Sequence, residues 1–133
     1  MNRFCLDTSA YSHFKRGFES AGRVISSARW IGVPVIVLGE LRAGFALGRR
    51  AVENEAELSE FLLHPVVQVL DVDEAASRHF AQIVTVLRKK AVVVPTNDLW
   101  IASLAMREAA TVLTYDAHFS AIEQVASLIL TPD

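Results

Sequence analysis

Four carboxylate residues of this chain each follow an apolar run, and this repeated placement is the first sign of chemistry in the sequence. They are Asp7 after residues 4–6, Glu40 after residues 33–38, Asp98 after residues 91–95 and Asp116 after residues 111–114. If the runs are buried strands of an open α/β sheet, all four side chains reach the edge where such folds bind ligands. Carboxylates crowded at one edge raise each other's pKa or require a cation, so the sequence predicts a divalent metal site.

The types of ligand indicate which cation such a site would hold. The four acids offer oxygen atoms without a paired histidine or cysteine, and such a set favours Mg²⁺ or Mn²⁺ over Zn²⁺. His118 follows Asp116 by two residues, but with no second histidine nearby we expect a surface or hydrogen-bonding role for it. Polar residues that lie beside the acids could orient the carboxylates or bound water, although capping is their commoner role: Thr8, Ser9, Asn97 and Thr114.

A divalent cation among carboxylates suits the hydrolysis of phosphodiester bonds. One metal lowers the pKa of an attacking water, and a second, about 3.5 to 4 Å away when present, stabilises the leaving oxygen. The basic residues best placed to contact substrate phosphates are Lys15, Arg16 and Arg42. Each residue also has a simpler explanation, since a single acid can cap a helix and a single basic residue can serve solubility. Four acids at four such positions are hard to explain by capping alone.

The composition is that of one globular domain. The chain has 133 residues, of which 52% are hydrophobic and 21% charged, and we expect a single domain over residues 1–133. The net charge of −2 predicts that any contact with nucleic acid is local. No apolar stretch approaches the roughly 18 to 20 residues that span a bilayer, and no signal-peptide pattern opens the chain, so we expect a cytoplasmic protein without a membrane partner.

Alternating strands and helices must position these residues. Short apolar runs predict strands at residues 3–6, 33–37, 66–70, 112–114 and 126–130, with Pro34 at the start of the second and residues 91–94 as a further strand or an extended connector. We expect Thr8 or Ser9 to be the N-cap of a first helix, with Asp7 in the turn before it. Helical spacing predicts further helices over 20–30, 38–47 and 53–64, one that Asp73 caps and one that starts at Thr96 or Asn97. This alternation predicts an α/β fold with a mainly parallel central sheet flanked by helices, an α/β/α sandwich.

Four strings carry the acids in order along nearly the whole chain. They are Leu6-Asp7-Thr8-Ser9, GELRAG at residues 39–44, PTNDLWIA at residues 95–102 and LTYDAHF at residues 113–119. Together with their spacing and the length of the chain, they resemble the PIN-domain nucleases, and most of all the VapC toxins of bacterial type II toxin–antitoxin systems. One departure is Lys89-Lys90-Ala91, where such proteins often carry a glycine before the segment that leads to the third acid.

The resemblance implies a PIN-like fold and a Mg²⁺-dependent endoribonuclease that cleaves structured RNA, often tRNA or ribosomal RNA. By residue matching, it implies that Asp7, Glu40, Asp98 and Asp116 form an acidic quartet that binds the metal. Thr8 or Ser9 and Asn97 would support the quartet. The resemblance also implies a homodimer and a small VapB-type antitoxin protein that holds the toxin inactive.

Two other classes of function stay open at this point. One is a Mg²⁺-dependent phosphoryl-transfer or receiver domain, but Thr114 and Tyr115 stand where a receiver would present a lysine, and Ser9 stands where a haloacid-dehalogenase-type phosphatase would have an aspartate. The other is a catalytically silent PIN-like module that binds RNA or a protein, against which the repulsion among four retained acids counts. The acids alone do not separate an RNA substrate from a DNA substrate.

Overall fold

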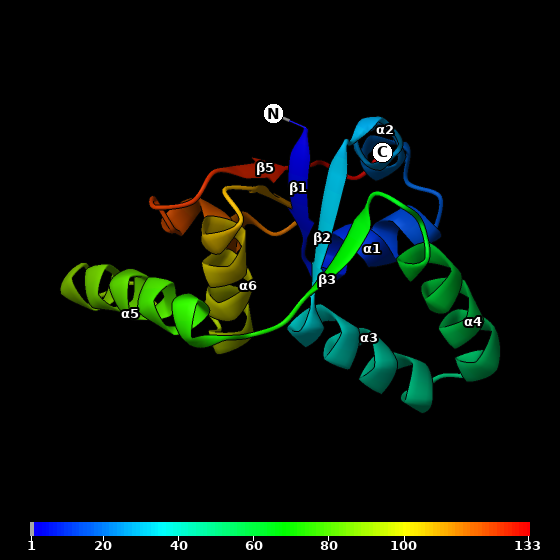
Figure 1. The fold of residues 1–133 in the computed structure, drawn as a ribbon, viewed down its shortest axis with the longest axis horizontal. Coiled ribbons are helices and arrows are strands. Elements are labelled where there is room, and N and C mark those ends of the chain that lie inside the picture. The colour runs from blue at the N-terminus through cyan, green and yellow to red at the C-terminus, as the bar shows by residue number, and fades with distance from the viewer. Residues whose placement is uncertain (1) are drawn as a thin grey trace.

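A five-stranded parallel sheet forms the centre of the computed structural model, which describes residues 2–133. Its strands are β1 (Arg3–Leu6), β2 (Trp30–Pro34), β3 (Val67–Leu70), β4 (Thr111–Thr114) and β5 (Ser127–Ile129). The spatial order is β3-β2-β1-β4-β5, and every pairing is parallel. The carboxyl ends of the strands therefore share one edge of the sheet, and α1 and α3 begin there (Figure 1).

Pairs of helices connect the strands. They are α1 (Thr8–Lys15) and α2 (Glu19–Ser27) after β1, α3 (Val35–Leu47) and α4 (Ala51–Leu62) after β2, and α5 (Glu74–Lys89) and α6 (Thr96–Arg107) after β3. The short 3-10 helix η1 (Ala117–Ala121) lies between β4 and β5. In Figure 1, α5 and α6 lie to one side of the strands, and α1, α2 and α4 lie to the other. The predicted parallel sheet with flanking helices is confirmed.

Apolar residues of the central strands and of α6 form the core. The strands β1 and β4 are buried over nearly their whole length, as expected for strands that are covered on both faces. Helix α6 contributes six buried residues, which are Leu99 and the stretch 101–105, and contacts β1, β2 and β4. Cys5 is fully buried, and this burial raises the pKa of its thiol, so the residue serves as a small core hydrophobe.

The second strand lies three residues earlier than the sequence predicted. We expected residues 33–37 with Pro34 at the start, whereas β2 is Trp30–Pro34 and Pro34 is the N-cap of α3. The predicted helix over residues 20–30 accordingly ends at Ser27. The apolar run continues from β2 into α3, so hydrophobic periodicity does not mark the boundary between them. Because proline has no N–H to donate, it fits the end of this strand and the start of the helix.

Residues 92–95 form a connector without regular secondary structure, so the strand that the sequence allowed here is absent. After α5 the chain reverses at Ala91, whose φ of +57° lies in the left-handed region. Glycine is the usual residue at this position after a helix, because a Cβ atom is strained there. The departure noted in the sequence, Lys89-Lys90-Ala91, therefore includes a residue whose backbone conformation favours glycine.

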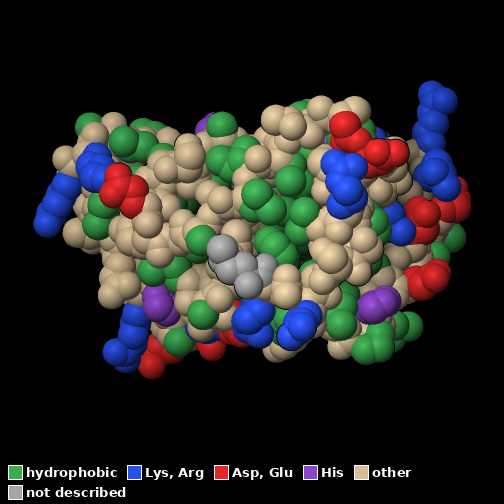
Figure 2. All heavy atoms as spheres, turned by 90° about the horizontal axis from the view of Figure 1, so that it is seen from above, with side chains coloured by type: hydrophobic (Ala, Val, Ile, Leu, Met, Phe, Trp, Pro, Cys, Tyr) green, Lys and Arg blue, Asp and Glu red, His purple; other side chains and the backbone are tan. Residues whose placement is uncertain are grey.

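The surface at the amino ends of the strands shows no concentration of one charge. In Figure 2, which views this end, basic and acidic side chains are both scattered around the rim. Among the described residues, no helix is both long and apolar enough to span a membrane.

Candidate metal-binding acidic site

Asp7 is the most buried of the four acids and also caps a helix. Strand β1 brings it to the edge of the sheet, where its exposed fraction is 4%. Its Oδ1 accepts a hydrogen bond of 2.8 Å from the backbone N–H of Ala10, which makes Asp7 the N-cap of α1. The predicted caps, Thr8 and Ser9, are therefore wrong, since both lie within the helix. Capping and a place in the acidic site are thus combined in one side chain.

Two hydroxyl groups hold the Asp7 carboxylate. Ser9 Oγ donates to Oδ1 at 2.8 Å, and the buried Thr114 Oγ1 donates to Oδ2 at 2.5 Å. Ser9 Oγ also accepts from the backbone N–H of Tyr115 at 3.0 Å, while Thr114 Oγ1 accepts from the N–H of Asp116 at 2.8 Å. These contacts tie the end of β1 to the end of β4, so the position of Asp116 depends on the position of Asp7.

Glu40 lies on the second turn of α3 and links two other helices. Its Oε1 accepts a hydrogen bond of 2.5 Å from Thr8 Oγ1, at the start of α1. Its Oε2 accepts a hydrogen bond of 3.2 Å from Asn97 Nδ2, at the start of α6. All four polar residues proposed from the sequence thus contact an acid: Thr8 and Asn97 bind Glu40, and Ser9 and Thr114 bind Asp7.

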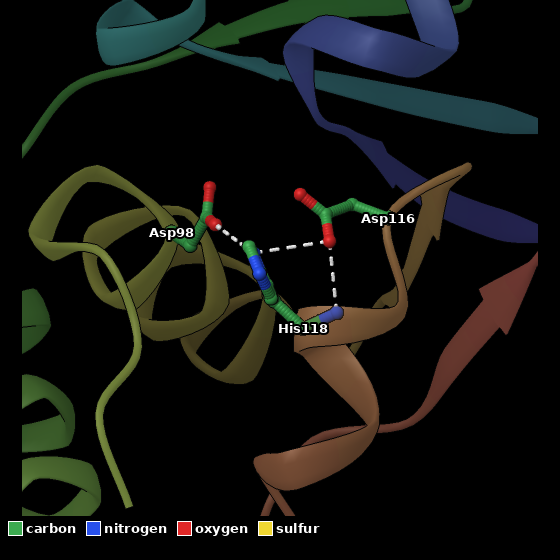
Figure 3. Close-up of side chains that lie close together, drawn as sticks. All are labelled: Asp98, Asp116 and His118. Atoms are coloured by element: carbon green, nitrogen blue, oxygen red, sulfur yellow. Dashed lines mark hydrogen bonds and ion pairs between the residues drawn. The ribbon is translucent and has the colours of Figure 1, made fainter.

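Asp98 and Asp116 approach each other with His118 between them (Figure 3). Asp98 lies in the first turn of α6, and Asp116 is the N-cap of η1. His118 Nδ1 lies 3.0 Å from Asp116 Oδ1 and 3.7 Å from Asp98 Oδ2. One ligand atom from each of the three residues lies within 4.8 Å of the others. The imidazole of His118 therefore lies within ion-pair distance of two acids of the site.

The sequence did not indicate this position of His118 because it depends on a 3-10 turn. The N–H of His118 donates a hydrogen bond of 2.8 Å to Asp116 Oδ1, which closes the first turn of η1 and turns the imidazole back toward the carboxylate. A turn this short leaves no hydrophobic periodicity. The only sequence feature that could have indicated this placement of the imidazole is that His118 follows the capping residue Asp116 by two positions.

Burial and mutual repulsion characterise the acids. Burial, followed by the charges of Asp116, Asp7 and Glu40, raises the pKa of Asp98 to about 6. Burial is also the main cause that raises the pKa of Asp7, and the charge of Asp116 adds to it. Within residues 2–133, no lysine or arginine forms an ion pair with any of the four acids. The site therefore has excess negative charge, which a bound cation would neutralise.

The chemistry of this donor set fits a divalent metal ion. Carboxylate oxygens are the ligands that hard cations prefer, and Asp98, Asp116 and His118 are close enough to share one ion. The sequence predicted that strands bring all four acids to one edge of the sheet, and this was correct for two of them. Asp7 and Asp116 do follow strands, but Glu40 lies within α3, and Asp98 follows the connector into α6. Helix starts deliver these two acids to the edge that the strands also reach.

The three basic residues proposed from the sequence lie in two different environments. Lys15 and Arg16 are exposed at the end of α1, and together with Arg50 they line a hollow of about 250 Å³ between α1, α3 and α4. Arg42, in contrast, binds Glu55 through two hydrogen bonds, from Nε at 2.9 Å and from Nη2 at 3.1 Å. Its charge is partly compensated, so Lys15 and Arg16 are better placed to meet a phosphate group.

The chain is similar to proteins of known family over almost its full length. A family model described as PIN domain matches residues 4–125. Ribonuclease VapC4 from Mycobacterium tuberculosis is 36% identical over 94 residues, which cover 71% of this chain and 72% of VapC4. The structure of VapBC2 from Rickettsia felis, bound to a DNA fragment from their promoter, matches 96% of this chain and 98% of its own with a TM-score of 0.83 and 25% identity.

A second solved structure has the same arrangement. VapBC-5 from Mycobacterium tuberculosis, a member of the VapBC family of toxin–antitoxin systems, has a TM-score of 0.77 and 26% identity over 98% of this chain and 100% of that chain. The span that the family model matches contains Asp7, Glu40, Asp98 and Asp116. The likeness therefore includes the fold, and the matched span contains all four acids of the candidate site.

Proposed function

This chain belongs to the PIN domain family, and we propose that it is a metal-dependent endoribonuclease, the toxin of a type II toxin–antitoxin pair. The resemblance to VapC proteins seen in the sequence is confirmed. The observation that carries the proposal is the close approach of Asp98 to Asp116 and its electrostatic coupling to Asp7, Glu40 and Asp116, without an ion pair to lysine or arginine among the described residues. The relative VapC4 is a ribonuclease, which supports RNA as the substrate class.

We assign the cation to Asp7, Glu40, Asp98 and Asp116, with Mg²⁺ as the physiological ion and Mn²⁺ as its substitute. When bound, such a cation supplies a nucleophilic water at neutral pH and stabilises negative charge on the phosphate. The chain contributes orientation. Ser9 and Thr114 fix the Asp7 carboxylate, and Thr8 and Asn97 fix that of Glu40, so the oxygen donors are positioned before the substrate arrives.

We propose that Lys15 and Arg16 bind phosphates of an RNA strand, and that tRNA or ribosomal RNA is the substrate. Both side chains are exposed and line one hollow, so they could contact consecutive phosphates of one strand. Arg42 can join them only if it releases Glu55, which costs the two hydrogen bonds between them. Because the basic residues are few, the metal site supplies much of the interaction with phosphate.

We also propose that residues 1–133 act as one domain in the cytoplasm, form a homodimer and bind a small VapB-type antitoxin. The related structures contain VapBC proteins of toxin–antitoxin systems, which supports such a partner. Exposed apolar side chains are available for protein contacts, with exposed fractions of 90% for Leu47, 83% for Leu63 and 93% for Val93. Recovery of a small protein with the tagged chain from its source cell would test the antitoxin, and sedimentation at micromolar concentration would test the dimer.

The proposed activity is tested by incubating the purified chain with total cellular RNA and, in parallel, with single-stranded DNA. Each substrate is treated with Mg²⁺, with Mn²⁺ or with EDTA. We expect discrete RNA fragments that need a metal and no comparable fragments from DNA. Intact RNA under every condition would contradict the nuclease and favour the catalytically silent binding module. Cleavage of DNA alone would contradict the substrate class.

A further inference from the structure

The acidic site contains a nitrogen donor, the imidazole of His118, in addition to the oxygen ligands that the sequence predicted. Resting on the function proposed above, we propose that His118 is a nitrogen ligand of the cation bound by Asp98 and Asp116, and that it raises the affinity of the site for Mn²⁺ relative to its affinity for Mg²⁺. Figure 3 shows the imidazole between the two carboxylates, with Asp98 supplied by α6 and Asp116 by the segment that leads into η1. The three ligand atoms lie within 4.8 Å of one another.

The distances from His118 to the two acids suit ligands that share one ion. Ligand atoms that lie side by side on one ion are about 3 Å apart when metal–ligand bonds are about 2.1 Å long. His118 Nδ1 lies 3.0 Å from Asp116 Oδ1, which has this value, and 3.7 Å from Asp98 Oδ2, which is longer. The three residues would therefore hold one ion together.

The backbone holds His118 in place. Its N–H donates to Asp116 Oδ1 at 2.8 Å, so the histidine and the acid are joined within one turn. The next residue, Phe119, is fully buried in the core and anchors η1 against the sheet. A ligand on an anchored turn binds a metal with little loss of conformational freedom. The imidazole itself is half exposed, so an ion can reach it.

Nitrogen ligation changes which metals the site favours. Mg²⁺ prefers oxygen ligands and keeps several of its waters, whereas imidazole nitrogen is bound better by transition-metal ions. Mn²⁺ is the member of that series that also accepts a set rich in carboxylates. His118 therefore raises the affinity for Mn²⁺ more than the affinity for Mg²⁺. A competing role is that His118 only hydrogen-bonds the two acids in the metal-free protein and moves away when the ion binds.

Pulsed electron paramagnetic resonance of the full chain with bound Mn²⁺ distinguishes these roles. A directly bound imidazole gives a ¹⁴N coupling, which we expect in the wild type and in His64→Gln, a matched control at an exposed histidine in the turn after α4. We expect His118→Gln to lose the coupling. Labelling the wild type with ¹⁵N-histidine should convert the coupling to that of ¹⁵N, so one readout does not depend on a variant.

Competition titrations of Mn²⁺ against Mg²⁺ provide the second readout. In His118→Gln the ratio of the Mn²⁺ affinity to the Mg²⁺ affinity should fall roughly tenfold, while His64→Gln should keep the wild-type ratio. Bound Mn²⁺ without nitrogen coupling, or an unchanged ratio in His118→Gln, would overturn this inference alone. If the wild type bound neither ion, the proposed metal-dependent function would fail together with it.

Discussion

The buried hydroxyl of Thr114 donates a hydrogen bond of 2.5 Å to Asp7 Oδ2, and this contact joins the carboxyl ends of β4 and β1. The same hydroxyl accepts from the N–H of Asp116 at 2.8 Å. One side chain therefore sets the relative position of two acids that are far apart in the sequence. The geometry of the site depends on this core threonine as much as on the acids.

Replacing the hydroxyl tests this dependence. Thr114→Val keeps the shape of the side chain but removes one of the two hydroxyl groups that hold the Asp7 carboxylate, and it takes away the oxygen that accepts from the Asp116 N–H. We expect the free energy of unfolding to fall by about 1–3 kcal/mol, because unsatisfied buried polar groups are costly. RNA cleavage should fall as well. Thr85→Val on α5 is the matched control, since Thr85 is exposed and its hydroxyl only binds the Ala81 carbonyl of its own helix. Wild-type stability and activity in Thr114→Val would contradict this role.

The stability of the metal-free protein should depend on pH in a direction set by Asp98. Burial and the neighbouring acids raise its pKa to about 6 in the folded state, from the ordinary value of 3.8. Between pH 5 and 7 the folded state therefore binds more protons than the unfolded state, and the free energy of unfolding should rise as the pH falls from 7 to 5. Asp7, whose pKa is also raised, acts in the same direction.

Urea denaturation in EDTA at pH 5, 6 and 7 measures this dependence. Asp98→Asn should weaken the dependence and stabilise the metal-free protein at pH 7 by about 1 kcal/mol, a value that allows for solvent screening. The acids with lowered pKa values, Glu55, Asp73 and Asp133, stay ionised over this range and should not obscure the trend. A free energy of unfolding that is lower at pH 5 than at pH 7 would contradict the repulsion between Asp98 and the neighbouring acids.

The two exposed basic residues of α1 should govern binding of RNA more than the chemical step. We expect the double variant Lys15→Ala, Arg16→Ala to raise KM, to leave kcat nearly unchanged and to make binding less dependent on salt, because fewer counterions are released from RNA. The control is Arg88→Ala, Lys89→Ala in the last turn of α5, which also removes two positive charges. Equal effects of the two double variants would mean that overall charge, and not this surface, is responsible.

The left-handed residue after α5 offers a test of backbone strain. Ala91→Gly should stabilise the protein by about 0.5–1 kcal/mol, because glycine adopts the φ of +57° without a Cβ penalty. Ala56→Gly, at an exposed position inside α4, should have the opposite effect of similar size. Thermal denaturation of both variants measures the difference. Destabilisation by Ala91→Gly would contradict the proposal that the backbone of Ala91 is strained.

The sequence was sufficient to find the acids and the class of fold because both depend on short-range patterns. Short apolar runs correctly identified β1, β3, β4 and β5, and every polar residue chosen beside an acid contacts one in the structure. The order of the strands in the sheet could not be read in this way, since it depends on packing between residues far apart in sequence.

The errors of sequence reasoning have a common physical origin in boundaries between elements. Residues 33–37 are apolar whether they end a strand or start a helix, so Pro34 was assigned to the wrong end of β2. Asp7 was expected in a turn before the cap, whereas it is itself the cap. The position of His118 required the geometry of η1, which leaves no pattern in the sequence.

The central claim is that the acidic quartet binds the metal required for RNA cleavage. Its most direct test is the initial rate of cleavage of total cellular RNA at saturating Mg²⁺ by the wild type, by Asp98→Asn and by Asp71→Asn. Asp71 is exposed in the loop after β3, so its variant removes one charge outside the site. We expect Asp98→Asn to lower the rate roughly 10²-fold or more, and Asp71→Asn to keep it. A wild-type rate in Asp98→Asn, or cleavage by the wild type in EDTA, would contradict the claim.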